Sequence, residues 1–488
     1  MLEVKIERET RWLFAVAAGL ALASLVGELW LIGRTELVYD EAYYTLWSRH
    51  LVWGYYDHPP MVAAWIRAST TLFGPSEFGV RALDVFVFGA MPALVGWVGA
   101  RLFDSGRAGL VAASAWLTMP LVAGAFIATP DSPLVLFICI GFYGLVEVWR
   151  GRGSGWWLVG LGLGLAALTK LSAAFFFAGV GMAVVATPSL RRWLRSPEPY
   201  AAAALALAIA APFLIWNAEH GWLSFGRQLA RVPPHQFAPH FLLDFFASQF
   251  GLANPFTFVA AAAALTAAFR RSGGPTVEAV RLPALYGAPM VLYLSFHALH
   301  SQVQGNWPGP LYPLIAILAG AAAIGGPPWA ARSARIGVAF GAAAIALLYL
   351  HAAAAWPSFG RLDPLARFGG WREVAHAVDV EARAENAAYV VTSGYAAKSL
   401  LTYYGDDARP VLEMEEPLRW VFQPPPPPHL FDAAGVAVVK SSPGAADDLK
   451  QRFRSVQFVG RVDRKFGETS VETYELYRVA DPIAPIAP

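Results

Sequence analysis

Runs of about 20 apolar residues recur from residue 12 to residue 356, and this is the length that a helix needs to cross a hydrocarbon core. The run from Trp156 to Ala186 is too long for one crossing and has Lys170 near its middle, so we expect two short helices that meet at one membrane face. The pattern predicts about eleven membrane-spanning helices. The runs are Trp12 to Gly33, Gly79 to Ala100, Gly109 to Ile127, Ser132 to Trp149, Trp156 to Ala186, Tyr200 to Trp216, Phe241 to Phe269, Leu282 to Leu299, Pro308 to Gly325 and Ile336 to Trp356.

Positive charges gather in every second loop between these runs. Short loops rich in Lys and Arg stay in the cytoplasm, so the alternation predicts the orientation of the chain. We expect a multi-pass protein of the inner (plasma) membrane, with its amino terminus inside. The outer face would then carry Asp40 to Glu77, Thr129 to Asp131, Lys170, Asn217 to His240 and His300 to Trp307, together with the tail after Trp356. The loop arginines are Arg101, Arg107, Arg150, Arg152, Arg191, Arg192, Arg195, Arg270, Arg271, Arg332 and Arg335.

Composition agrees with a membrane protein. The chain is 56% hydrophobic and 15% charged, against about 25% charged residues in ordinary soluble domains. Its 37 Lys and Arg nearly balance its 35 Asp and Glu, and a net charge of +2 gives no reason to expect a nucleic-acid partner. Cys139 is the single cysteine, which excludes a disulfide within the chain.

The composition changes after residue 356. Charges become regular, and the alternating runs Ala388 to Thr392, Val436 to Val439 and Glu472 to Arg478 predict strands among short helices. We therefore expect an α-helical membrane domain over residues 1–356, with a structured first outer loop at 34–78, and a soluble α/β domain over 357–488 outside the membrane.

The first outer loop is the richest in polar groups. Asp40 and Glu41 follow the first predicted span directly, where a carboxylate can act as a general base or bind a metal ion. An acidic cap at the membrane interface is the alternative. Amphipathic helices are predicted at Leu46 to Trp53 and at Met61 to Phe73, so the loop is expected to be structured.

The motifs resemble those of a known family. An Asp-Glu pair after the first span, a Tyr-x-x-x-Pro-Pro segment and a late Asn-Trp-Pro are similar to the protein O-mannosyltransferase superfamily (glycosyltransferase family 39). The likeness is greatest to the bacterial branch that contains the lipid A aminoarabinose transferase. The residues that carry it are Asp40-Glu41, Tyr55 to Pro60, Gly79-Val80-Arg81, Thr129-Pro130-Asp131, Thr169-Lys170 and Gly305-Asn306-Trp307-Pro308.

This resemblance implies a GT-C glycosyltransferase that takes its sugar from a polyprenyl phosphate and transfers it to a lipid, glycan or protein in an extracytoplasmic cavity. It implies that Asp40 is the general base of an inverting transfer and that Glu41 orients or supports it. Tyr55 and Asp57 would support the site. The chain departs from the aminoarabinose transferase before the paired prolines, where Asp57-His58 replaces a Glu-Lys pair.

A phosphate leaving group needs cations to stabilise its developing charge. Arg81, Lys170 and His58 are the cations that we assign to it. A lysine between two apolar half-helices is costly unless it is partnered or functional, with snorkelling to the interface as the alternative. Asp131 either positions the donor, holds Arg81 or caps the next helix, and Asn306 would line the acceptor side. A divalent metal ion near Asp40, Asp57 or the histidines is left open.

A polytopic transporter or lipid flippase is the main rival, because it would also have a broken helix and charges within the membrane. The hydropathy has no inverted repeat, and the polar residues gather on one face, which favours the enzyme. An assembly factor that binds proteins through its outer domain is a third class, and it would leave Asp40 without a role.

Overall fold

The computed structural model describes residues 2–230, 237–271, 274–354, 359–484 and 486. The described chain forms two compact units. The helical unit comprises Met1–Trp30, His58–Val62 and Ala82–Leu350, and the α/β unit comprises Leu31–Asp57, Ala63–Arg81 and His351–Pro488. Most of the first loop thus groups with the carboxyl-terminal part of the chain, whereas its segment His58–Val62 belongs to the helical unit. The predicted domain boundary at residues 356 and 357 lies outside the described residues.

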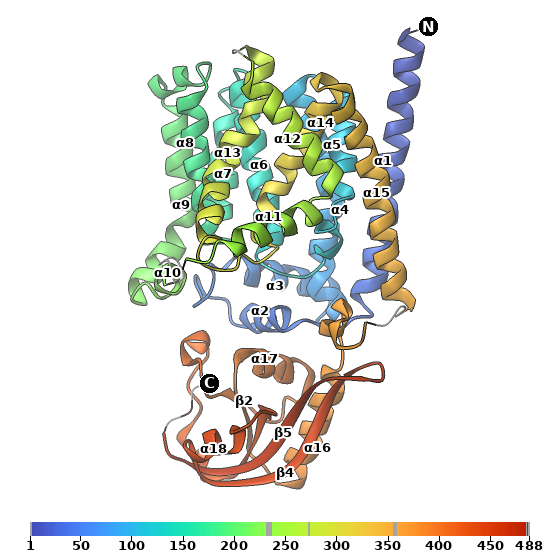
Figure 1. Ribbon diagram of the computed structural model, residues 1–488. Coiled ribbons are helices and arrows are strands. Elements are labelled where there is room, and N and C mark those ends of the chain that lie inside the picture. Colours follow the sequence, from blue (N-terminus) through green and yellow to red (C-terminus); the bar gives the residue numbers. More distant parts are fainter. Residues whose placement is uncertain (1, 231–236, 272–273, 355–358, 485, 487–488) are drawn as a thin grey trace. The chain divides into compact units, whose positions relative to one another are not determined.

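The helical unit is a bundle of apolar helices (Figure 1). α6 packs on α7, α7 on α9, α5 on α14 and α8 on α13. The helices that lie wholly or largely in this unit are α1 (Leu2–Ile32), α4 (Glu77–Phe103), α5 (Gly106–Leu117), α6 (Asp131–Trp149), α7 (Gly155–Ala167), α8 (Ala174–Ala186), α9 (Glu198–Glu219), α10 (Leu223–Leu229), α11 (His240–Leu252), α12 (Pro255–Phe269), α13 (Pro275–His297), α14 (Tyr312–Gly325) and α15 (Pro328–Ala354).

Six helices in the described part of the chain are long and apolar enough to cross a membrane, and three shorter apolar helices accompany them. The run Phe241 to Phe269, expected as one span, consists of two helices, α11 and α12, bent by 105° at their junction. Asn254 causes the break, because it has a φ of 65° and its side chain accepts a hydrogen bond from the Phe256 amide, which starts a new helix. The predicted number of about eleven spans stays a prediction.

α6 and α7 are in close contact through glycines. A Cβ atom at Gly144 of α6 would lie 2.7 Å from the carbonyl oxygen of Gly155, and one at Gly162 of α7 would lie 2.6 Å from the amide nitrogen of Gly141. Small residues let two helix backbones approach this closely within a membrane. The contact fixes the two helices whose ends carry Asp131 and Lys170.

The helical break predicted around Lys170 is confirmed. α7 ends at Ala167, a short 3-10 turn covers Leu171–Ala173, and α8 begins at Ala174. Lys170 itself is extended, with φ −157° and ψ 140°. Its side chain therefore leaves the chain at an interruption of the helix.

The carboxyl-terminal part of the α/β unit is a mixed five-stranded sheet in the order β2-β1-β3-β5-β4, in which β4 and β5 form a long hairpin (Figure 1). β1 is parallel to β2 and β3, whereas β5 is antiparallel to β3 and β4. The predicted fold class is confirmed, and the strands predicted at Ala388 to Thr392, Val436 to Val439 and Glu472 to Arg478 lie in β1, β3 and β5. The elements are α16 (Trp371–Ala384), β1 (Tyr389–Thr392), α17 (Tyr395–Tyr404), β2 (Val411–Glu413), β3 (Gly435–Lys440), α18 (Ala445–Lys450), β4 (Phe453–Phe466) and β5 (Thr469–Pro482).

The first loop contributes α2 (Tyr39–Arg49) and α3 (Met61–Phe73). The helix predicted at Met61 to Phe73 is confirmed, but the one predicted at Leu46 to Trp53 was wrong in its bounds. α2 begins at Tyr39 because the Glu41 carboxylate accepts a hydrogen bond from the Val38 amide at 3.0 Å, which satisfies a free N–H at the helix start. α2 packs on α17.

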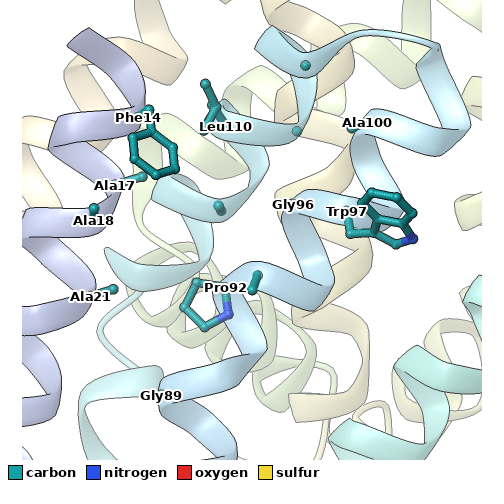
Figure 2. Close-up of a pocket in the computed structure, with 14 residues that line it drawn as sticks. Phe14, Ala17, Ala18, Ala21, Gly89, Pro92, Gly96, Trp97, Ala100 and Leu110 are labelled. Atoms are coloured by element: carbon teal, nitrogen blue, oxygen red, sulfur yellow. The ribbon is translucent and has the colours of Figure 1, made fainter. Parts of the chain in front are cut away.

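An apolar crevice of about 420 Å³ lies between α1, α4 and α5 (Figure 2). Phe14 and Ala17 line it from α1, Pro92 and Trp97 from α4, and Leu110 from α5. None of its lining residues carries an ionisable side chain, so the candidate chemistry lies elsewhere.

Candidate functional site

Glu41 and Arg81 form a fully buried ion pair. The Arg81 Nε lies 2.7 Å from Glu41 Oε1 and its Nη2 lies 2.5 Å from Oε2, and both side chains are 0% exposed. Arg81 also donates to the carbonyl oxygens of Ile32, Thr35 and Glu36. The pair therefore connects the end of α1, the start of α2 and the start of α4, and the geometry favours a positioning role for both residues.

Asp40, the residue before Glu41, has a different environment. It is partly exposed, and its Oδ1 accepts a hydrogen bond from the Tyr395 hydroxyl at 3.1 Å. Tyr395 begins α17, 355 residues further along the chain. Asp40 is thus the acid of the first turn of α2 whose carboxylate lies nearer to solvent.

Burial raises the pKa of the Asp40 carboxyl to about 6. The hydrogen bond from Tyr395 and the positive charges of Arg419 and Arg367 lower this pKa, whereas the negative charge of Asp57 raises it. A carboxylate with a pKa near the working pH is both ionised and basic enough to accept a proton in a transition state.

Asp57 is buried and pairs with Arg419, which follows it by 362 residues. The Asp57 Oδ2 also accepts a hydrogen bond from the Tyr43 hydroxyl at 3.1 Å. Arg419 makes a second ion pair with Glu416 at 2.9 Å. The arrangement gives Asp57 a supporting position, as the sequence analysis assigned to it, and that assignment stays a prediction.

Tyr55 is part of an aromatic cluster that includes side chains of α2. Its ring is stacked on Trp47 with 4.1 Å between the centroids, and its hydroxyl donates to the Trp47 and His50 carbonyl oxygens. Trp420 and Phe422 pack against the same cluster. These contacts make Tyr55 a rigid support for the helix that carries Asp40.

A second polar cluster lies in the helical unit. The Lys170 Nζ donates to Asp131 Oδ1 at 2.7 Å, and the Asn306 side-chain amide donates to Asp131 Oδ2 at 2.6 Å. Lys170 and Asp131 are 18% and 16% exposed, so the pair is still in contact with solvent. Three of the residues predicted from sequence are therefore brought together, with Asp131 holding Lys170 and Asn306.

His58 belongs to the helical unit and is partly buried. The segment that follows it is tied to the break at Lys170, because the Met61 amide donates to the Leu168 carbonyl oxygen at 2.9 Å. The paired prolines are thus held beside the end of α7. In the described part of the chain, no three His, Cys, Asp or Glu side chains lie close enough together to hold a metal ion.

Tyr395 and Arg419 were missed by the sequence analysis as site residues. Nothing local distinguishes Arg419 from other arginines of the tail, since its partners Asp57 and Tyr43 lie more than 350 residues away. Only the packing of α17 and its neighbours on α2 brings these residues to Asp40.

The comparisons with known proteins agree with the resemblance seen in the motifs. Residues 57–216 match the family of dolichyl-phosphate-mannose-protein mannosyltransferases, a segment that includes Asp57, Arg81, Asp131 and Lys170 but not Asp40. The lipid A galacturonosyltransferase RgtD of Rhizobium johnstonii is 32% identical over 301 residues, which cover 58% of this chain. The match spans 60% of the length of that relative.

Solved structures show the fold. ArnT from Cupriavidus metallidurans matches in the apo state with a TM-score of 0.66 and 16% identity, over 96% of this chain and 98% of that one. The same protein bound to undecaprenyl phosphate matches with a TM-score of 0.67 and 14% identity over the same shares. The predicted GT-C fold and the predicted resemblance are confirmed.

Proposed function

We propose that this chain, a membrane protein with the GT-C fold and the motifs of the protein O-mannosyltransferase superfamily, is a glycosyltransferase that uses a polyprenyl-phosphate sugar. The proposal places the active site on the extracytoplasmic face of the inner membrane. The solved structure of ArnT with undecaprenyl phosphate supports a lipid-phosphate donor. RgtD is a lipid A galacturonosyltransferase, which makes lipid A the first acceptor to test.

The observation that carries the proposal is the environment of Asp40. It combines a partly exposed carboxylate, a hydrogen bond from Tyr395 and a pKa raised by burial to about 6. In the proposed step, Asp40 takes the proton of an acceptor hydroxyl while the hydroxyl oxygen attacks the anomeric carbon. The bond from that carbon to the phosphate oxygen breaks, the polyprenyl phosphate leaves, and the anomeric configuration inverts.

The cluster of Lys170, Asp131 and Asn306 is the proposed donor-phosphate site. Lys170 is partly exposed and donates one of its three N–H groups to Asp131. An ammonium in this position can donate another N–H to an oxygen of a bound phosphate. Asp131 would keep Lys170 in place, and the amide of Asn306 fixes Asp131 in turn. His58 would add a second, protonatable cation, because its segment is tied to the same break.

The test is turnover of Asp40→Asn in the full-length chain in lipid nanodiscs. Undecaprenyl-phosphate sugars serve as donors and lipid A as acceptor, and mass spectrometry follows the released undecaprenyl phosphate and the glycosylated product. The amide keeps the shape of the carboxylate but cannot accept the proton, so turnover per folded protein should fall by about 10²- to 10⁴-fold. Asp432→Asn, at an exposed aspartate, is the matched control and should keep wild-type turnover.

The pH dependence has a definite sign. Asp40 must be ionised to act as a base, so kcat/KM should fall as the pH drops below about 6, where the carboxyl becomes protonated.

Near-normal turnover in Asp40→Asn would contradict the proposal. A transporter would move lipid phosphate across the membrane without releasing sugar from it.

A further inference from the structure

Asp40 receives its hydrogen bond from the carboxyl-terminal domain. The Tyr395 hydroxyl donates to Asp40 Oδ1 at 3.1 Å, from the first turn of α17. The Tyr395 ring is held on several sides. Its centroid lies 5.2 Å from that of Tyr43 and 5.8 Å from that of Tyr39, and the guanidinium carbon of Arg419 lies 4.0 Å from the ring centroid.

Arg419 is itself fixed by three neighbours. It pairs with Asp57 and with Glu416, and its carbonyl oxygen accepts a hydrogen bond from the Tyr43 hydroxyl at 3.3 Å. Its side chain is only 8% exposed, so its contacts are with other residues of the protein and it is poorly accessible to a substrate. A planar guanidinium stacked on an aromatic ring also restricts the orientation of that ring.

We propose that Tyr395 and Arg419 are positioning residues for Asp40, so that the carboxyl-terminal α/β domain completes the active site. Tyr395 holds the carboxylate in one orientation and favours its ionised form, and Arg419 holds the Tyr395 ring. This inference rests on the proposed role of Asp40 as the base, and it gives the outer domain a role in the reaction.

The hydrogen bond from Tyr395 affects the pKa of the Asp40 carboxyl in a definite direction. The charged and titratable groups that act on Asp40 are Asp57, Arg419, Arg367, Tyr39, Tyr44 and Tyr395. A hydroxyl that donates to a carboxylate stabilises the ionised form and lowers its pKa. Removing the Tyr395 hydroxyl therefore raises the pKa of Asp40 above its present value of about 6 and leaves less of the base ionised at neutral pH.

The test is Tyr395→Phe in the full-length chain, because this change keeps the ring and removes only the hydroxyl. Infrared spectroscopy follows the carboxyl C=O band as the pH is raised, and the spectrum of Asp40→Asn is subtracted so that the band of Asp40 remains. We expect the midpoint to move up by about one pH unit, which is the size of one hydrogen bond to a charged group. The acidic limb of kcat/KM should move by the same amount, with turnover recovering at high pH.

Two further variants sharpen the test. Arg419→Lys keeps the charge opposite Asp57 but loses the planar group over Tyr395, so it should shift the midpoint in the same direction. Tyr403→Phe, at another tyrosine of α17, should leave both the midpoint and the turnover unchanged. Lys398, on the same helix, has a pKa lowered by burial to about 6, but an amine has no C=O band and does not enter the infrared titration.

An unchanged Asp40 midpoint in Tyr395→Phe would overturn the inference. So would a loss of turnover that does not recover at high pH, because that is the result of a purely structural role. The infrared titration does not depend on turnover. A wild-type protein that releases no sugar would refute the proposed function, while a shifted midpoint would still establish that Tyr395 controls the ionisation of Asp40.

Discussion

Asp40 and Glu41 are neighbours in the first turn of α2, yet their environments differ completely. The Glu41 carboxylate is buried, caps α2 and binds Arg81 with both oxygens. The Asp40 carboxylate is partly exposed and has a pKa raised by burial to about 6. Glu41 therefore holds the loop, whereas Asp40 has the environment that the proposed general base requires. Arg81, which we predicted to bind phosphate, pairs with Glu41.

Breaking the Glu41–Arg81 pair should destabilise the protein. Removing one partner leaves an uncompensated buried charge, which typically costs about 3–5 kcal/mol. We expect Glu41→Gln and Arg81→Met each to lower the thermal unfolding midpoint at a fixed scan rate, and the double variant to lower it by less than the sum of the two. Glu373→Gln, at an exposed glutamate of α16, is the control. Strictly additive effects would show that the two side chains do not act as a pair.

At the scale of elements, the break between α7 and α8 decides where the Lys170 side chain lies. α6 and α7 are in contact through glycines, α6 begins with Asp131, and the chain leaves α7 at Lys170. A continuous helix through residue 170 would place the lysine against an apolar surface, where its charge is costly. The break instead brings it to Asp131 with a 2.7 Å contact and leaves it partly exposed.

Lys170→Ala should raise the KM for the polyprenyl-phosphate donor, because the proposed phosphate site loses its cation. A charge-assisted hydrogen bond contributes about 1.5–3 kcal/mol, so we expect a rise of roughly 10- to 100-fold. Lys170→Arg should recover part of the loss. The control is Arg191→Ala, at an exposed arginine beyond the opposite end of α8. Donor titrations that superimpose for wild type and Lys170→Ala would remove the phosphate assignment.

At the scale of the molecule, the positive charges of alternate loops predict the topology. They place the first loop and residues 362–478 outside the membrane, on the side where the polyprenyl-phosphate donor is proposed to react. An alkaline phosphatase fused to the carboxyl terminus should be active, since that enzyme folds only outside the cytoplasm, and a green fluorescent protein fused there and exported unfolded should be dark. The opposite pattern would place the α/β domain inside.

The sequence by itself determined the membrane class, the break at Lys170 and part of the polar clusters, including Asp40, Asp131 and Lys170 but not Tyr395 or Arg419. Long apolar runs and an isolated lysine are local signals, because the free energy of placing a segment in lipid depends on the residues of that segment. Short motifs are local too, since they consist of neighbouring residues. The alternating residues of β1, β3 and β5 are also a local signal, because they predict strands without any knowledge of what those strands pack against. The break at Asn254 was missed because its sequence signal, the pair Asn254-Pro255, is weak against a continuous apolar run.

Only the tertiary structure decided which partners each polar residue has and how deeply it is buried. The sequence offered Arg81, Lys170 and His58 as cations for the phosphate, but Arg81 is buried against Glu41 whereas Lys170 remains partly exposed beside Asp131. Tyr395 and Arg419 reach Asp40 and Asp57 across 355 and 362 residues of chain. The physical reason is that burial, desolvation and ion pairing depend on which segments pack together, and no local pattern records that choice.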